Sequence, residues 1–429
     1  MSDTRLARDG GNPVWTDGWP LWPQPGPGAE RRLLDTLHSG RWAVSGHWTG
    51  RPALESELAT TFAEFTGARW CLPVDHGSSA LLTALHAVGV RPGDEVIVPG
   101  LTWVASASVV ARAGAVPVLV DIDPRTLCID PAAVAAAVTP ATTAIIAVHL
   151  YSAMADMDAL RELADRHGLA LIEDAAQSYG ARWRGRGAGS LGIAGAFSTQ
   201  QGKTLTSGEG GLFVTSDAQV RDRAEMLRGD GRRYARGPHT VGRPDLEEVP
   251  AVQGWNMHLS EFQSALLLDG LERLDEQNRQ RAAAAELLDK LLTEYGDLEP
   301  VDPYPGNDRR AYYHYVIRLR DGAFGGHDAA TVADALGAEL GYWIHPPYQP
   351  LNAHPLYDPR RLPGVAEQGR AAGFDPARFH LPAAHREARR AVVLHHPMLL
   401  GSEDHLHAVI EAFDKVRQHA ADLVPGSNR

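Results

Sequence analysis

Residues 50–215 alternate between short apolar runs and longer stretches with helical periodicity, and this alternation is the strongest constraint on the fold. The apolar runs have the length of strands, and they are Trp70–Val74, Glu95–Val98, Val116–Val120, Ala144–Val148, Ala170–Ile172, Ala194–Phe197 and Leu212–Thr215. Helical stretches lie among them, at Leu54–Phe65, Ser79–Val88, Trp103–Ala113 and Met157–His167. Strands that alternate with helices are typical of a mostly parallel sheet with helices on both faces. The sequence therefore predicts an α/β fold with a mostly parallel seven-stranded sheet, in which ligands bind beyond the carboxyl ends of the strands.

The pattern changes after about residue 255. A long helical stretch, Ser260–Leu292, precedes a Pro- and Gly-rich breaker at 299–306. A strand at Tyr312–Leu319 and helices at Ala329–Leu340 and Ser402–Ala420 follow. Residues 1–30 are rich in Gly, Pro and Trp, and they predict an extended arm that packs on the body or on a second subunit. We therefore predict an N-terminal arm (1–45), a large domain (46–275) and a smaller C-terminal α+β domain (276–429).

Composition narrows the class of partner. The 41 Lys and Arg residues face 53 Asp and Glu residues, and the net charge of −12 argues against nucleic acid or an anionic membrane as a partner. The two cysteines, Cys71 and Cys128, cannot form a disulfide framework and indicate a reducing compartment. No apolar run is long enough to span a membrane or to act as a signal peptide. We expect a cytoplasmic protein.

Lys203 is the most unusual single residue. The segment Gly202-Lys203-Thr204 resembles the end of a phosphate-binding P-loop, but Phe197 stands where that motif requires glycine. Lys203 follows a buried-looking strand and precedes a glycine-rich stretch at 207–211, which lets backbone approach a ligand closely. A lysine that is desolvated at the rim of a sheet becomes a nucleophile. On spacing alone, an exposed loop lysine is the commoner alternative.

Three further features support a site at this edge. The turn Asp75–Ala80 joins a strand to a helix, and small residues at a helix N-terminus leave N–H groups free for an anion. Asp174 follows another strand, where a carboxylate faces a cation or caps a helix. Trp103 follows a third strand, where it either stacks on a flat ring or packs in the core. Together these residues supply a phosphate cradle, a stacking ring, an acid and a lysine, the equipment that pyridoxal 5′-phosphate (PLP) requires.

From about residue 30 to about 420, the chain resembles the sugar aminotransferases of the DegT/DnrJ/EryC1/StrS type, within the aspartate-aminotransferase superfamily of fold type I. The resemblance is carried by the motifs HGSSAL, PGLTWVAS, VDIDPRTLCID, VHLYSAMADMDAL, IEDAAQ, AFSTQQGKTLTSGEGG and GWNMHLSEFQSAL. It implies a PLP-dependent aminotransferase that works as a homodimer with shared active sites. It also implies a ping-pong reaction through a Schiff base at Lys203, with Lys203 as base and acid.

The same resemblance implies roles for individual residues. Lys203 matches the Schiff-base lysine, and Asp174 matches the acid that pairs with the pyridine nitrogen. The other implied cofactor-binding residues are Gly77, Ser78, Ser79, Trp103, Gln177, Ser198 and Asn256, and Asn256 reaches the phosphate from the partner subunit. His258 departs from the pattern, since many members have arginine there. The group that binds the donor's carboxylate is therefore open among His258, Arg232 and Arg233, and Tyr313 and Tyr348 are candidate walls of the substrate pocket.

Within the family, the lysine loop and the stretch YQPLNAHPLY resemble most the aminotransferases of scyllo-inosose and 2-deoxy-scyllo-inosose in aminoglycoside-type pathways. We therefore expect a cyclic keto-cyclitol acceptor and an amino-acid donor. The resemblance implies L-glutamine as the donor, and glutamate and alanine stay open as alternatives. Three alternatives are a nucleotide-linked keto-hexose as acceptor, a sugar dehydratase, and a non-catalytic regulatory protein with this fold. Lys203 argues against the dehydratase, because those relatives have histidine there. His395 and His396 lack an obvious third ligand, so we expect no metal site.

Overall fold

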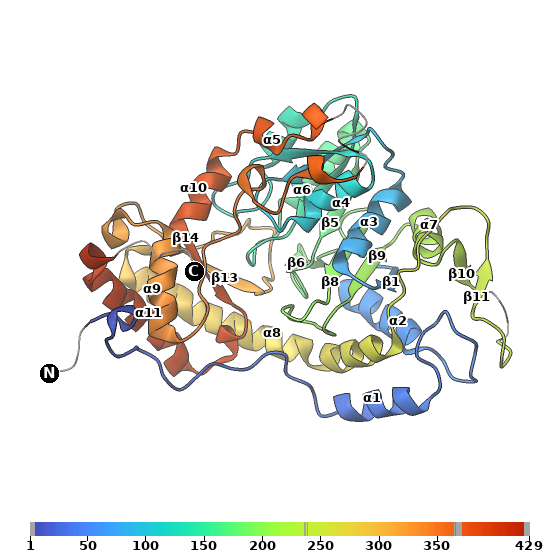
Figure 1. Ribbon diagram of the computed structural model, residues 1–429, viewed down its shortest axis with the longest axis horizontal. Coiled ribbons are helices and arrows are strands. Elements are labelled where there is room, and N and C mark those ends of the chain that lie inside the picture. Colours follow the sequence, from blue (N-terminus) through green and yellow to red (C-terminus); the bar gives the residue numbers. More distant parts are fainter. Residues whose placement is uncertain (1–4, 236, 238, 364, 366–370, 424–429) are drawn as a thin grey trace.

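The computed structural model describes residues 5–235, 237, 239–363, 365 and 371–423. A seven-stranded sheet lies at its centre (Figure 1), and the strand order is β1 (Trp70–Val74), β9 (Gly211–Thr215), β8 (Ala194–Ser198), β5 (Ala170–Asp174), β4 (Thr142–Val148), β2 (Glu95–Pro99) and β3 (Val116–Val120). The five strands from β8 to β3 run parallel, whereas β9 is antiparallel to both of its neighbours. This architecture confirms the predicted α/β fold with a mostly parallel sheet.

Helices cover the sheet on both faces, which explains why its strands are buried almost throughout. These helices are α2 (Leu54–Thr66), α3 (Gly77–Val88), α4 (Ala105–Arg112), α5 (Pro131–Ala137), α6 (Met157–His167) and α7 (Ala218–Arg228). The bounds of β3 and α6 are those that the sequence predicts. Asp156 caps the start of α6 by accepting from the N–H of Ala159, and Gly168 ends the helix in the left-handed region. Sequence analysis missed α7.

Two short hairpins lie outside the sheet. They are β6 (Arg182–Trp183) with β7 (Arg186–Gly187), and β10 (Arg232–Tyr234) with β11 (Leu246–Glu248). Arg182 and Arg186 therefore lie in the first hairpin, and Arg232 and Arg233 lie in the second.

A single helix joins the sheet domain to the C-terminal part. Helix α8 (Glu261–Tyr295) has 35 residues and starts with a capping box between Ser260 and Gln263. The smaller part contains an antiparallel sheet of β12 (Leu298–Pro300), β13 (His314–Leu319) and β14 (Ala391–His395), with α9 (Ala329–Leu340), α10 (Pro382–Arg390) and α11 (Glu403–Gln418). This confirms the α+β character of the C-terminal part, although sequence analysis missed β14 and α10.

The predicted domain boundary at 275/276 falls inside α8. Up to Leu274, the buried apolar residues of this helix belong to the hydrophobic cluster of the large sheet, and from Ala284 onward they belong to a second cluster in the smaller part. Residues 1–4 of the predicted arm and 424–429 of the predicted small domain lie outside the described residues. The two-domain division stays a prediction.

The N-terminal arm packs on the body of the chain. Helix α1 (Ala29–His38), which sequence analysis missed, lies near α8 (Figure 1). The indole of Trp19 donates to the carbonyl oxygen of Leu340 over 2.6 Å, and the backbone N–H of Trp15 donates to that of Glu339. Tryptophans of the arm are thus partly buried against α9, one of the two arrangements that the sequence predicts.

Candidate active site

A cavity of about 450 Å³ lies where the carboxyl ends of β4, β5 and β8 meet the N-terminus of α3. Its position follows from the topology, since parallel strands bring their carboxyl ends to one edge of the sheet. The large domain supplies one wall, and the smaller part supplies the opposite one. The residues that line it are His76, Gly77, Ser78, Leu81, Thr102, Trp103, Ala105, Val148, Asp174, Ala176, Gln177, Ala196, Phe197, Ser198, Gln200, Lys203, Glu209, Tyr313, His314, Trp343, His345, Tyr348 and His395.

Lys203 projects its amine into this cavity. The Nζ atom lies 4.2 Å from the centroid of the Tyr313 ring. Burial lowers the pKa of Lys203 to about 8, although the negative charge of Asp174 opposes this shift. About a tenth of the amines are then uncharged at pH 7, which makes Lys203 a far better nucleophile and proton acceptor than an ordinary lysine.

Asp174 ends β5 and faces the cavity from the sheet. Its carboxylate is only 7% exposed. The hydroxyl of Ser106 donates to its Oδ2 atom over 2.7 Å, and the N–H of Ala176 donates to its Oδ1 atom over 3.2 Å. These two donors hold the carboxylate in one orientation, so it can pair with a cationic group inside the cavity.

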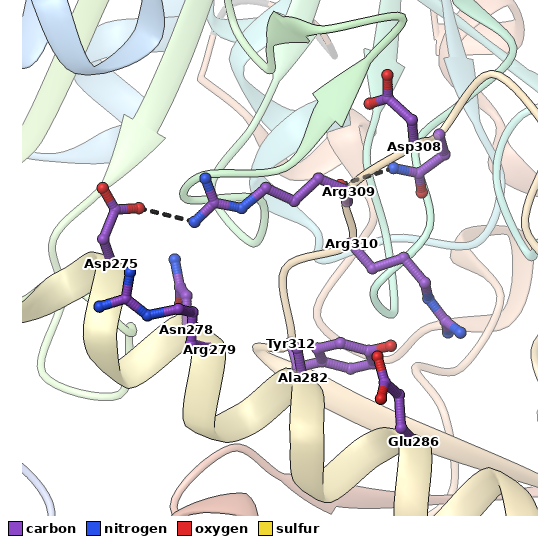
Figure 2. Close-up of a pocket in the computed structure, with 10 residues that line it drawn as sticks. Asp275, Asn278, Arg279, Ala282, Glu286, Asp308, Arg309, Arg310 and Tyr312 are labelled. Atoms are coloured by element: carbon purple, nitrogen blue, oxygen red, sulfur yellow. Dashed lines mark hydrogen bonds and ion pairs between the residues drawn. The ribbon is translucent and has the colours of Figure 1, made fainter.

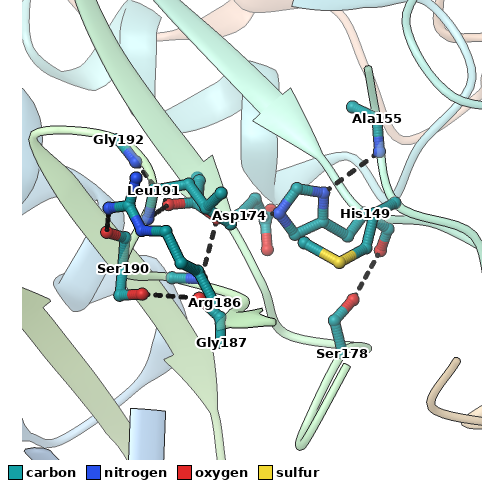
Figure 3. Close-up of polar contacts among 12 residues, drawn as sticks. His149, Ala155, Asp174, Ser178, Arg186, Gly187, Ser190, Leu191 and Gly192 are labelled. Carbon is teal, nitrogen blue, oxygen red and sulfur yellow. Dashed lines mark hydrogen bonds and ion pairs between the residues drawn. The ribbon is translucent and has the colours of Figure 1, made fainter. Parts of the chain in front are cut away.

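Glu173, the preceding residue, points to the opposite side of β5 and organises the scaffold. Its carboxylate is fully buried and accepts hydrogen bonds from the N–H groups of Gly189, Leu191 and Gly192 and from His149. Figure 3 shows Leu191 and Gly192, in the loop before β8, on one side of this group and His149, just after β4, on the other. Since successive residues of a strand face opposite sides, one carboxylate serves the cavity and its neighbour fixes the framework. Sequence analysis quoted Glu173 only as the neighbour of Asp174.

The N-terminus of α3 forms a cradle for an anion. The N-cap residue, His76, makes no side-chain cap, so the N–H groups of the first turn have no acceptor within the helix. A Cβ atom on Gly77 would lie 2.6 Å from Cβ of Ser198, so only glycine fits this close approach. Gly77, Ser78 and Ser198 line the cavity, whereas Ser79 does not.

Aromatic and amide groups form the mouth of the cavity. The Gln177 side chain donates from Nε2 to the hydroxyl of Tyr348 over 3.1 Å, and the N–H of Tyr348 donates to the hydroxyl of Tyr151 over 2.7 Å. The rings of Trp103 and Tyr348 are 5.9 Å apart. Trp103 is 48% exposed and Trp343 is 70% exposed, so both rings can cover a flat ligand. Sequence analysis missed Trp343.

Two predicted residues lie away from this cavity within the same chain. Asn256 is exposed and forms an isolated bridge with Gly229. His258 lies 3.7 Å from the carboxylate of Glu55, which forms a buried ion pair with Arg228. Burial and the charge of Arg228 lower the pKa of His258, although Glu55 opposes this.

The other two candidates for the donor's carboxylate are engaged elsewhere. Arg232 pairs with Asp230 and Arg233 pairs with Glu247.

A second cavity, of about 460 Å³, lies between α8 and the loop before β13 (Figure 2). Its charged side chains largely engage one another or the scaffold, since Arg309 pairs with Asp275 and Arg310 donates to Ser152. None of the residues that sequence analysis singled out for chemistry lines this cavity. The arrangement of a lysine, an acid and an anion cradle occurs in the first cavity.

Metal and membrane sites are not seen in the part of the chain that the structure describes. No group of three or more His, Cys, Asp or Glu residues there is placed to hold a metal ion. No helix within those same ranges combines the length and the apolar character needed to cross a bilayer.

The fold and the site together define an aminotransferase of fold type I. The chain belongs to the DegT/DnrJ/EryC1/StrS aminotransferase family, whose sequence profile matches residues 32–412.

Two relatives match nearly the whole chain. It is 51% identical over 420 residues to the L-glutamine:2-deoxy-scyllo-inosose aminotransferase of Streptoalloteichus tenebrarius, a match that covers 97% of this chain and 99% of that protein. It is 47% identical over 422 residues to the L-glutamine:scyllo-inosose aminotransferase of Streptomyces griseus, covering 98% of this chain and 99% of that protein. The match confirms the predicted family.

Two solved structures resemble this chain over almost its whole length. The crystal structure of 3-amino-5-hydroxybenzoic acid synthase matches with a TM-score of 0.79 at 33% identity, covering 94% of this chain and all of that one. A structure of DesI in the presence of its TDP-sugar product matches with a TM-score of 0.76 at 28% identity, covering 97% of this chain and 96% of that one. Both similarities extend through the sheet domain and the smaller part.

Proposed function

We propose that this enzyme uses PLP to transfer the amino group of L-glutamine to a keto-cyclitol of the inosose type, in aminoglycoside-like biosynthesis. The observation that carries the proposal is that Lys203 and Asp174 line one cavity whose wall is otherwise free of lysine and arginine among the described residues. The names of the relatives support both the donor and the acceptor.

The residues present fit PLP. The first turn of α3 and Ser198 offer donors for a phosphate, and the close approach at Gly77 leaves that cradle open to a ligand. Asp174, held by Ser106, would pair with the ring nitrogen, Gln177 would bind the ring hydroxyl, and Trp103 in the cavity wall would cover a ring face. The cofactor, when bound, supplies an electron sink for the carbon that loses or gains the amino group.

The side chains of this chain divide the remaining work. Lys203 Nζ accepts a proton from the substrate carbon, because burial keeps part of the amine population uncharged near neutral pH. The protonated amine can then act as the acid in the same transfer. Asp174 holds a proton on the ring nitrogen by its negative charge, and Ser106 keeps that carboxylate aligned. Tyr313 flanks the amine and limits the directions in which it can move.

The charge of the cavity wall favours an uncharged polyol over a nucleotide-linked sugar. His314, His345 and His395 line the side contributed by the smaller part. Burial lowers the pKa of all three histidines, that of His395 to about 4, so they are neutral imidazoles at physiological pH. Neutral imidazoles suit hydroxyl groups, whereas a diphosphate calls for arginine or lysine.

The proposed enzyme is a homodimer. Several large apolar side chains are exposed, among them Leu34, Leu37 and Trp42 in the N-terminal arm and Trp255 in the large domain. Such residues are costly in water and are typical of a subunit interface. Asn256 follows Trp255 directly, which supports its assignment to the phosphate site of the partner subunit. Ser79, in the first turn of α3, stays assigned to the phosphate cradle of its own subunit. His258, Arg232 and Arg233 stay candidates for the donor's carboxylate across this interface.

Both cysteines are free and buried, which supports a reducing compartment such as the cytoplasm.

A two-step spectral experiment tests the proposal. The PLP-loaded enzyme is mixed with L-glutamine, and the visible band of the cofactor is expected to disappear. Addition of 2-deoxy-scyllo-inosose or scyllo-inosose is then expected to restore it, whereas a nucleotide-linked 4-keto-hexose is not. The Lys203→Ala variant should show neither step. Restoration by the nucleotide-linked sugar alone would contradict the proposed acceptor, and turnover by Lys203→Ala would contradict the role of the lysine.

A further inference from the structure

The segment that carries Lys203 belongs to no helix or strand. Strand β8 ends at Ser198 and β9 begins at Gly211, and the cross-loop hydrogen bonds from the N–H of Thr199 to Gly210 and from the N–H of Gln201 to Gly208 stop short of Lys203. Within the loop, the N–H of Lys203 donates to the carbonyl oxygen of Gln200 over 2.8 Å. The carbonyl groups of Gly202 and Lys203, which lie on the two sides of the Lys203 Cα atom, also need hydrogen-bond donors.

Two side chains from distant parts of the sequence supply these partners. The indole Nε1 of Trp22, in the N-terminal arm, donates to the carbonyl oxygen of Lys203 over 3.1 Å. The Nε2 atom of His396, just after β14, lies 3.0 Å from the carbonyl oxygen of Gly202, and since a carbonyl only accepts, Nε2 carries the hydrogen. The two consecutive peptide carbonyls at Lys203 are thus each held by one ring.

The two rings also contact each other. Trp22 meets His396 edge-on, with 4.6 Å between ring centroids and an angle of 87° between the planes. His396 is fully buried, and the guanidinium of Arg281 lies 5.3 Å from the centroid of the Trp22 ring. The indole is therefore fixed by ring contacts as well as by its own hydrogen bond.

The arm around Trp22 is anchored to α8. The N–H of Gly26 donates to the carboxylate of Asp269 over 2.8 Å, and Arg273 donates to the carbonyl oxygen of Gln24 over 2.6 Å. In Figure 1 the dark blue arm runs along the smaller part and then past α8 to α1. The residues that follow Trp22 are therefore held on α8.

We propose that Trp22 and His396 are positioning residues for Lys203. By fixing the two carbonyls that flank its backbone, they fix the point from which its flexible side chain reaches the substrate carbon. The Lys203 amine has to reach the substrate carbon in every turnover, so a backbone that shifts its position lowers the fraction of productive encounters. The N-terminal arm then supports the active site, although none of its described residues lines the cavity. The consequence for turnover rests on the proposed function, whereas the consequence for the backbone does not.

The variant Trp22→Phe tests this directly, because it removes the N–H donor and keeps an aromatic ring. Trp19→Phe is the matched control, since it removes an equivalent indole-to-carbonyl hydrogen bond from the same arm, but one that ends at Leu340. In the cofactor-free full chain, amide hydrogen exchange over 199–208 is expected to be about fivefold faster in Trp22→Phe, the factor that one neutral hydrogen bond gives. In Trp19→Phe it should equal that of the wild type.

Turnover of the PLP-loaded enzyme supplies the functional readout. We expect kcat of Trp22→Phe to fall about tenfold, with KM for L-glutamine within about twofold of the wild type, as for a residue that acts through the position of the base. The pair His396→Leu and His396→Gln provides a second route, since glutamine keeps an N–H donor and should rescue both exchange and kcat.

Equal loop exchange in Trp22→Phe and Trp19→Phe would overturn the proposal, as would equal kcat for the two His396 variants. If the wild type fails to aminate inososes but the exchange difference is present, the proposed acceptor is wrong and the positioning role stands.

Discussion

Lys203 carries a charge that the cofactor-free fold accommodates poorly, and replacing it with methionine measures this effect. Burial lowers the pKa of Lys203 from 10.5 to about 8, with Asp174 opposing the shift. Between these two values, the folded state binds fewer protons than the unfolded state, so the free energy of unfolding rises with pH. The two pKa values imply that the lysine destabilises the fold by about 3 kcal/mol at pH 7 and by less than about 1 kcal/mol at pH 10.

Urea denaturation of the cofactor-free wild type and of Lys203→Met, each at pH 7 and pH 10, provides the assay. The advantage of the methionine variant in free energy of unfolding should shrink by about 2–3 kcal/mol between pH 7 and pH 10. Comparing the two proteins at each pH cancels the titration of every group that they share. A packing difference between methionine and lysine does not depend on pH, so it cancels when the two pH values are compared. A constant advantage, or one that grows with pH, would refute the assignment of a depressed pKa.

Three other substitutions test the site and its framework. Asp174→Asn should retain the far-UV circular dichroism of the wild type and lose about a hundredfold or more in kcat, since the negative charge that faces the cavity is gone. Gly77→Ala should raise the dissociation constant for PLP about tenfold in a fluorescence titration, because the new Cβ lies 2.6 Å from Cβ of Ser198. Unchanged binding would contradict the assignment of the first turn of α3 as the phosphate cradle. Glu173→Ala should lower the free energy of unfolding by about 3–5 kcal/mol, because three buried N–H groups lose their acceptor. The exposed Glu162→Ala serves as its control and should change stability by less than about 0.5 kcal/mol in the same urea titration.

The sheet domain was predictable from sequence because each of its strands is a continuous apolar run. Strands β1 and β3 and helix α6 have the predicted bounds, and the other strands of this sheet differ by one or two residues. Burial on both faces removes the ambiguity between core and surface positions, so local pattern is enough. Helix α7 was missed because its sequence is mostly polar, and only its packing on α3 makes it visible.

The cavity was predictable on one side only. Lys203 and Asp174 follow strands of the large sheet, and the rule for parallel strands brings them to one edge. The opposite wall depends on β14, whose pairing with β13 places His395 beside His314 across a long interval of sequence. No local pattern encodes that register, so His395 was considered only as a metal ligand. The contact between Trp22 and the lysine loop was invisible for the same reason.

The uninterrupted course of α8 has a consequence for recombining this enzyme with its relatives. Helix α8 contributes apolar residues to both hydrophobic clusters. A chimera that takes the sheet domain from one enzyme and the smaller part from another, joined in a loop beside α8, would therefore pair α8 with one foreign core. A crossover within α8, between Leu274 and Ala284, would exchange the cavity wall that contains His314, His345 and His395 as one block. Lys203, Asp174 and the phosphate cradle would all still come from the first enzyme. Acceptor preference could then be transplanted without rebuilding the catalytic half.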